Sequence, residues 1–106
     1  MTPTDRTIAE QLKRQLLEAG VPVRVVRVYG SRARENHSPD SDLDVFLVLE
    51  RSDIDIERCI EDIAWEVGFA ADRIITTVEV TVEQLEDSPL RVSPFYRNVM
   101  AEGVLI

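Results

Sequence analysis

Cysteine and long hydrophobic runs are what this 106-residue chain most clearly lacks. Its single cysteine, Cys59, cannot form an internal disulfide, which is usual for proteins of the reducing cytosol. No apolar run approaches the roughly 18 residues that a membrane-spanning helix needs. The N-terminus also has no basic-then-apolar pattern of a secretory signal. We therefore expect a cytoplasmic protein that does not enter a membrane.

Positive charge is also in short supply. The chain has 12 lysines and arginines against 20 aspartates and glutamates, so its formal net charge is −8. Such a protein repels phosphate backbones, and we do not expect duplex DNA or RNA as a direct partner. The length predicts a single domain, residues 1–106, with 44% hydrophobic residues to fill its core. A domain this small has a thin stability margin, which a partner subunit in a hetero-oligomer or homodimer could widen.

The hydrophobic spacing predicts an α+β fold. Helical spacing begins after the threonines at the N-terminus and ends at Gly20, and a valine-rich strand follows. After a polar loop come a second strand, a helix that starts with a capping signal at Ser52 and ends at Gly68, and a third strand. The order predicts a small mixed sheet of three to four strands, covered mainly on one face by helices. The predicted ranges are a helix within 2–20, strands 23–29, 42–50 and 74–82, a helix ending at 67, a turn at 88–89 and a helix over 94–101.

The second strand begins with two carboxylates on one face. Asp42 and Asp44 alternate with the apolar side chains of the other face and lie roughly 7 Å apart along the strand. Two such groups repel each other and lose hydration at a strand end. Mg²⁺ prefers carboxylate oxygens and completes its shell with water and substrate phosphates. The pair therefore predicts a magnesium site.

A glycine and a serine end the first strand, ten residues before the carboxylates. Gly30 allows a sharp turn and a close approach of backbone to a ligand. If Ser31 begins a helical turn, its N–H and hydroxyl would face a phosphate. Arg32 and Arg34 follow as candidate phosphate clamps in an acidic chain. Together with the metal site, this turn predicts chemistry on a nucleoside triphosphate.

The segment GSRARENHSPDSDLD, residues 30–44, resembles the signature of the DNA polymerase β-like nucleotidyltransferase superfamily. That signature is Gly-Ser, ten residues, then Asp-x-Asp. In length the chain resembles the minimal nucleotidyltransferases, stand-alone catalytic cores often encoded beside a HEPN-domain partner. A weaker similarity covers the flanking strands and the C-terminal segment. Glu35 departs from the pattern, because many members have glycine there.

The resemblance implies an enzyme. Gly30 and Ser31 would hold the triphosphate, and Asp42 and Asp44 would bind two Mg²⁺ ions. The family adds a third carboxylate from a later strand, for which Glu79 is the candidate. The implied reaction transfers AMP from ATP to a hydroxyl, a tyrosine of a HEPN ribonuclease toxin. The chain would then be the antitoxin of a type VII toxin–antitoxin pair.

Two alternatives to protein modification stay open. In one, the chain is a non-catalytic antitoxin that neutralises its toxin by covering it. In the other, the acceptor is a small molecule such as an aminoglycoside, which the lack of an appended acceptor domain disfavours. His37 and Asp40 are expected to be ordinary loop residues at the surface. Trp65, Phe95 and Tyr96 are expected to serve packing or an interface.

Overall fold

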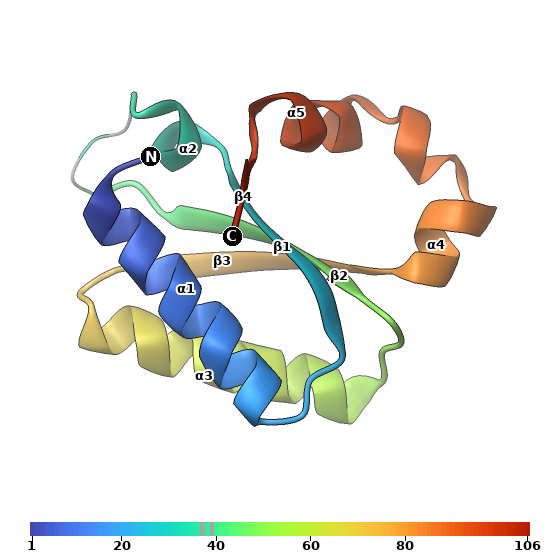
Figure 1. The fold of residues 1–106 in the computed structure, drawn as a ribbon, viewed down its shortest axis with the longest axis horizontal. Coiled ribbons are helices and arrows are strands. Elements are labelled where there is room, and N and C mark those ends of the chain that lie inside the picture. The colour runs from blue at the N-terminus through green and yellow to red at the C-terminus, as the bar shows by residue number, and fades with distance from the viewer. Residues whose placement is uncertain (37, 39) are drawn as a thin grey trace.

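A computed structural model describes residues 1–36, 38 and 40–106 of the chain. Four strands form one mixed sheet in the order β3-β2-β1-β4 (Figure 1). Strand β1 runs antiparallel to both of its neighbours, whereas β2 and β3 are parallel. The predicted mixed sheet is confirmed. The strands are β1 (Val23–Tyr29), β2 (Leu43–Leu49), β3 (Ile75–Thr81) and β4 (Val104–Leu105).

Two long helices, α1 (Pro3–Glu18) and α3 (Ile54–Ala70), cover one face of the sheet (Figure 1). Helix α1 begins where Thr2 Oγ1 accepts a hydrogen bond from the Asp5 N–H at 3.1 Å, with a proline in the first turn. Helix α3 links the parallel strands β2 and β3, as parallel pairs require. The larger core lies between these helices and the sheet. Its fully buried members include Leu12, Leu16, Val26, Val28, Leu43, Val45, Leu47, Leu49 and Ile60.

Shorter elements cover the opposite face only in part. These are α4 (Val82–Asp87), the 3₁₀ turn η1 (Pro89–Val92) and α5 (Pro94–Glu102). They enclose a smaller cluster in which Phe46 contacts the rings of Phe95 and Tyr96, with centroids 6.0 and 6.1 Å apart. On β2, this cluster begins at Phe46. Asp44 at the start of the strand, and Asp42 just before it, therefore lie outside the cluster.

Two local predictions need correction, and one element was missed. Helix α3 is capped by Asp53, whose Oδ1 accepts from the Ile56 N–H at 2.8 Å, and not by Ser52. It also continues past Gly68 to Ala70. Gly68 serves a close approach instead, because a Cβ there would lie 2.6 Å from the carbonyl oxygen of Arg73. Strand β4 was not predicted as a separate element, since two residues show no alternation.

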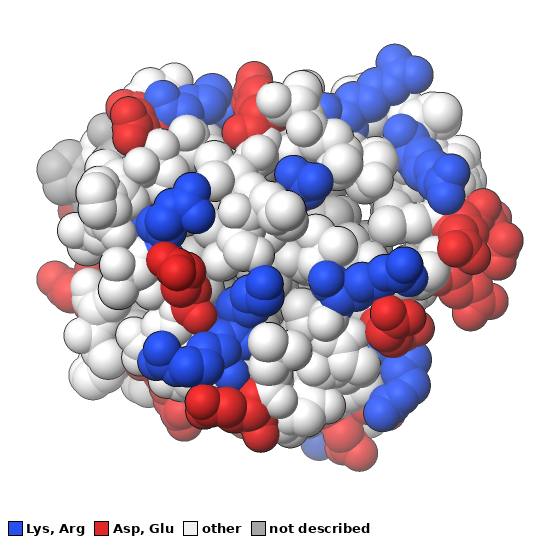
Figure 2. Space-filling model, viewed as in Figure 1, with Lys and Arg blue, Asp and Glu red and all other residues white. Residues whose placement is uncertain are grey.

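Charge is unevenly spread over the surface. On the face seen in Figure 2, Lys and Arg side chains are dispersed, and several adjoin a carboxylate, while Asp and Glu gather at the edge that carries α4. Within the described residues, no helix is both long enough and apolar enough to cross a bilayer.

A buried charge cluster joins the N-terminal helix to the segments around the second strand. The Asp5 carboxylate is fully buried, and Arg32 Nη1 of α2 (Ser31–Arg34) lies 3.3 Å from its Oδ2. Arg32 Nε also donates to the Ser41 carbonyl oxygen at 3.0 Å. Arg73, in the turn before β3, places its Nε 3.7 Å from Asp5 Oδ1. One carboxylate thus ties α1, α2, the residue before Asp42 and the start of β3 together.

Replacing this carboxylate is expected to cost far more than replacing an exposed one. Asp5→Ala leaves two arginines near each other without their shared anion, and we expect a loss of about 3–5 kcal/mol in the free energy of unfolding. Glu18→Ala is the control, because the Arg14–Glu18 pair of the same helix is exposed and 3.9 Å long. We expect it to change stability by less than about 1 kcal/mol. Urea titrations of both variants that gave equal midpoints would contradict a structural role for the cluster.

Candidate functional site

The glycine and the second aspartate of the Gly-Ser/Asp-x-Asp pattern are packed against each other. Tyr29 at the end of β1 pairs with Asp44 in β2, so Gly30 follows directly beside that carboxylate. Gly30 has φ +76° and ψ −158°, a conformation that is essentially restricted to glycine. A Cβ at this position would lie 2.5 Å from Asp44 Oδ2. Both the backbone conformation and the lack of space therefore require glycine here.

The first aspartate of the pair is held from the edge strand. Thr76 of β3 lies beside Asp44 in the parallel register, and its Oγ1 donates to Asp42 Oδ2 at 3.1 Å. Thr76 was not among the predicted site residues. Alternation alone placed it on the same face of β3 as the valines, but only the register shows that this face adjoins the carboxylates.

The surroundings of Asp44 disfavour its charge. Burial, and then the negative charge of Asp42, raises the pKa of Asp44, while Arg34 lowers it. Burial and the Asp44 charge likewise raise the pKa of Tyr29. Two neighbouring carboxylates that are partly buried are suitable ligands for a divalent cation, because the cation offsets the repulsion between them. Among the described residues, no group of three or more acidic, histidine or cysteine side chains is placed to hold a metal, so a cation at this point would have only the two carboxylates as protein ligands. Mg²⁺ accepts such a set because water and phosphate oxygens complete its shell.

Comparison with known proteins identifies the family. The family model described as nucleotidyltransferase domain matches residues 6–105. The chain belongs to this nucleotidyltransferase family. The resemblance noted in residues 30–44 is thereby confirmed, since the matched region contains both parts of the pattern. A comparison with curated protein sequences gives no significant match.

Solved structures with a similar fold come from toxin–antitoxin complexes. A chain in a toxin–antitoxin structure with AMP-PNP aligns with a TM-score of 0.63 and 18% identity, over 91% of this chain and 70% of that one. The tri-AMPylated Shewanella oneidensis HEPN toxin with its MNT antitoxin gives 0.59 and 16%, over 95% and 70%. The MntA–HepT complex gives 0.59 and 14%, over 94% and 69%. At these identities the likeness shows a shared nucleotidyltransferase fold.

The two arginines predicted as phosphate clamps have different environments. Arg32 is buried against Asp5, on the side away from solvent, so its prediction as a phosphate clamp does not fit the structure. Arg34 is exposed, pairs with Glu102 of α5 at 2.9 Å and is near enough to Asp44 to lower its pKa. Of the two, Arg34 is the one that lies beside the carboxylate pair.

The residue that departs from the family pattern adopts the conformation that glycine favours. Glu35 has φ +60°, in the left-handed region, at the C-terminal end of α2. Its side chain forms an ion pair with the N-terminal amine of Met1 at 2.8 Å. This contact connects the N-terminus to the loop between the two halves of the pattern. His37, which was predicted to be an ordinary surface residue of the loop, lies outside the described residues.

Glu79 does not join the carboxylate pair. It pairs with Leu47 in the parallel register, and Leu47 belongs to the core between the sheet and the long helices. The Glu79 side chain is therefore on the α3 face of the sheet, whereas Thr76 and Val78 point to the other face. Burial, and then Glu57 and Glu61 of α3, raises its pKa. The predicted third carboxylate is thus placed on the face opposite Asp42 and Asp44. The predicted alternation of β3 is confirmed, but its polar face was matched to the wrong face of β2.

The contact between Gly30 and Asp44 can be measured as a coupling. Gly30→Ala is expected to lower the free energy of unfolding by roughly 1–3 kcal/mol from backbone strain alone, with the steric conflict in addition. In an Asp44→Ala background the steric part disappears and only the strain is left. A double-mutant cycle by chemical denaturation is expected to show a smaller cost of Gly30→Ala in that background. Equal costs in both backgrounds would refute the direct contact.

The position of Glu79 gives a pH-dependent expectation. Its raised pKa means that ionisation in the folded state is disfavoured, so the stability contributed at acid pH is lost as pH rises from the ordinary value of 4.5 through the raised one. Glu79→Gln is therefore expected to raise the melting temperature at neutral pH and to have little effect near pH 4. Glu83→Gln, an exposed glutamate of α4, serves as the control. If Glu79 completed the metal site, its substitution would abolish stabilisation by Mg²⁺ and AMP-PNP, whereas the structure predicts that this stabilisation persists.

Proposed function

We propose that this chain is a Mg²⁺-dependent nucleotidyltransferase that transfers AMP from ATP to a hydroxyl. The acceptor we propose is a tyrosine of a HEPN ribonuclease toxin, which makes the chain the antitoxin of a type VII pair. The observation that carries the proposal is the contact of Gly30 with Asp44 in a chain of the nucleotidyltransferase family. A HEPN toxin bearing AMP in complex with an MNT antitoxin of the same fold supports the choice of acceptor.

In this proposal Asp42 and Asp44 hold the magnesium. The two predicted ions would share these carboxylates, because Glu79 lies on the other face and the described residues contain no third carboxylate beside the pair. When bound, Mg²⁺ would neutralise charge on the triphosphate and on the departing pyrophosphate. The Thr76 hydroxyl orients Asp42 by donating to its Oδ2, which leaves the other oxygen available as a ligand.

The turn after β1 receives the triphosphate. Gly30 brings the turn directly against Asp44, so a triphosphate held by the cation would lie beside the turn, where Ser31 supplies a hydroxyl and an N–H. Arg34 can leave its exposed pair with Glu102 to contact a phosphate oxygen at small cost. Phosphate charge near Asp44 would be repulsive without the metal, so these groups act together with the cation.

The reaction is an in-line displacement at the α-phosphorus. The acceptor oxygen forms a bond to phosphorus as the bond to the β-phosphate bridging oxygen breaks, and pyrophosphate leaves with that electron pair. The acceptor hydroxyl gives up its proton to water. The chain's own contribution is to hold the phosphate and the acceptor in line and to offset charge with Arg34.

One observation favours the second candidate, a non-catalytic antitoxin. The family's third carboxylate has no counterpart beside Asp42 and Asp44 among the described residues, where Thr76 stands in the neighbouring strand. A chain with an incomplete site could still neutralise a toxin by covering it. This candidate predicts neutralisation without nucleotide and without dependence on the carboxylates.

A labelling experiment separates the two candidates. The chain is incubated with Mg²⁺, ATP labelled on the α-phosphate and the proposed HEPN-domain toxin, which is sought among the products of the neighbouring open reading frames. We expect label on the toxin, and a loss of at least about a hundredfold in rate for Asp42→Asn/Asp44→Asn, since removing groups that stabilise transition-state charge costs that much. Tyrosine-to-phenylalanine variants of the toxin locate the acceptor.

Toxin activity is measured in the same samples. Neutralisation that needs ATP and is lost in the aspartate variant supports transfer. Equal neutralisation by the wild-type chain and the variant, with no label on the toxin, would replace the enzyme with the non-catalytic antitoxin. The exposed Asp62→Asn of α3 is the control for charge loss.

A further inference from the structure

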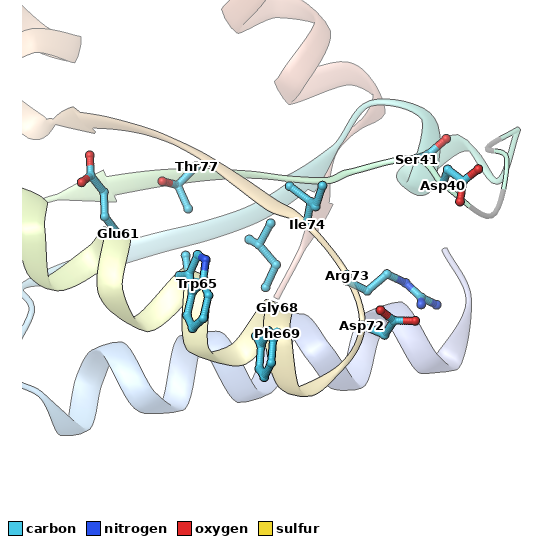
Figure 3. A pocket seen from close by; sticks show the side chains of 12 residues that line it. Asp40, Ser41, Glu61, Trp65, Gly68, Phe69, Asp72, Arg73, Ile74 and Thr77 are labelled. Carbon is cyan, nitrogen blue, oxygen red and sulfur yellow. The ribbon is translucent and has the colours of Figure 1, made fainter.

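An exposed pair of stacked aromatic rings stands out on α3. The rings of Trp65 and Phe69 lie parallel, with centroids 5.0 Å apart and planes 9° from each other, and their side chains are 67% and 74% exposed. Ile74, in the turn from α3 to β3, is also 67% exposed (Figure 3). Three large apolar side chains together in solvent mark an interaction site, and aromatic anchors dominate the energy of protein interfaces.

These side chains line a groove of about 960 Å³ beside the edge strand β3. Its charged rim is acidic: Asp40, Glu61 and Asp72 are exposed (Figure 3). The groove's arginine, Arg73, is instead paired with the buried Asp5. The groove therefore offers an apolar floor and negative charge at its edge. A nucleotide or another anion would be repelled from it.

The groove reaches the end of the proposed active site. Asp40 and Ser41 line it, and the next residue is Asp42. On the other side, Ile75 lines the groove, and the following residue, Thr76, donates to Asp42. Neighbouring strands are only about 5 Å apart, and β3 is the edge of the sheet. Only strand β3 therefore separates a ligand bound in the groove from Asp42 and Asp44, and the ligand can reach them by extending past that edge strand.

We propose that the groove lined by Trp65, Phe69 and Ile74 is the docking surface for the acceptor protein. The partner fits it with apolar side chains flanked by lysine or arginine, and reaches around β3 to place its hydroxyl at Asp42 and Asp44. This inference rests on the proposed function and names the surface that recognises its substrate. A second copy of the chain fits less well, because its own acidic rim would face Asp40, Glu61 and Asp72.

The first test removes the aromatic anchors. Trp65→Ser/Phe69→Ser is expected to weaken the Kd for the purified HEPN-domain toxin, the proposed acceptor, by at least about thirtyfold. The kcat/KM for label transfer to that protein falls by a similar factor. Melting-temperature shifts with Mg²⁺ and AMP-PNP stay unchanged. Ile54→Ser is the matched control: Ile54 is 59% exposed on the same helix, roughly 16 Å along its axis from Trp65.

The second test addresses the rim. Glu61→Lys reverses a charge in the groove and is expected to weaken association about tenfold at low salt, with the difference shrinking as salt is added. Asp62→Lys makes the same change on the next residue, which does not line the groove, and leaves the Kd within about twofold. Equal effects of the two variants would mean that only net charge matters and would overturn the proposed rim.

The outcomes separate this inference from the proposed function. No association of the wild-type chain with the HEPN-domain protein, or a Kd unchanged by the aromatic substitutions, would overturn the docking surface. A wild-type dimer in sedimentation that the aromatic variant dissociates would assign the groove to a second copy and also overturn it. If Asp42→Asn/Asp44→Asn keeps transfer activity while the aromatic variant loses association, the proposed function fails and the docking surface stands. If only the aspartate variant loses transfer, and the aromatic variant still associates with the toxin, the docking surface fails and the proposed function stands.

Discussion

The buried carboxylate of Asp5 is the interaction on which the surroundings of the site depend. It lies between Arg32, which follows the Gly-Ser turn, and Arg73, which precedes the edge strand. Through Arg32 it also reaches the backbone of Ser41, next to the first site aspartate. Buried ion pairs seldom add stability over apolar packing. What this cluster contributes is position. It fixes three segments that have few apolar side chains of their own, next to the place where the Gly-Ser turn meets Asp42 and Asp44.

Most of the fold follows from periodicity in the sequence. The valine-rich strand, the Asp-x-Asp strand and the two long helices have repeats that leave little choice, and the structure places them where the repeats indicate. Details that depend on a single side chain were less predictable. Either Ser52 or Asp53 can cap a helix, and the local sequence does not distinguish them, whereas the structure has Asp53 as the cap. The two-residue strand β4 forms by pairing with the free edge of β1, and no pattern within two residues predicts that pairing.

The residues around the site also fall into two groups, those that spacing along the chain predicts and those whose position depends on tertiary packing. Gly30, Asp42 and Asp44 were predictable because spacing along the chain places them together across an antiparallel pair. Glu79 was not, since the face that it occupies depends on how β3 aligns with β2 after a 17-residue helix. The two arginines show the same limit. They are two residues apart in one helical turn, and only tertiary packing sends Arg32 inward and leaves Arg34 at the surface.

The fit of Gly30 against Asp44 sets an order in which these two residues can be lost during evolution. While the aspartate is present, any larger residue at position 30 meets its oxygen, so the glycine cannot be replaced first without damaging the fold. Loss of the aspartate removes that obstacle, although the backbone conformation still favours glycine. Inactive descendants of such a protein should therefore retain the glycine after the acid has gone, and a chain with the acid but no glycine should be the rarer intermediate.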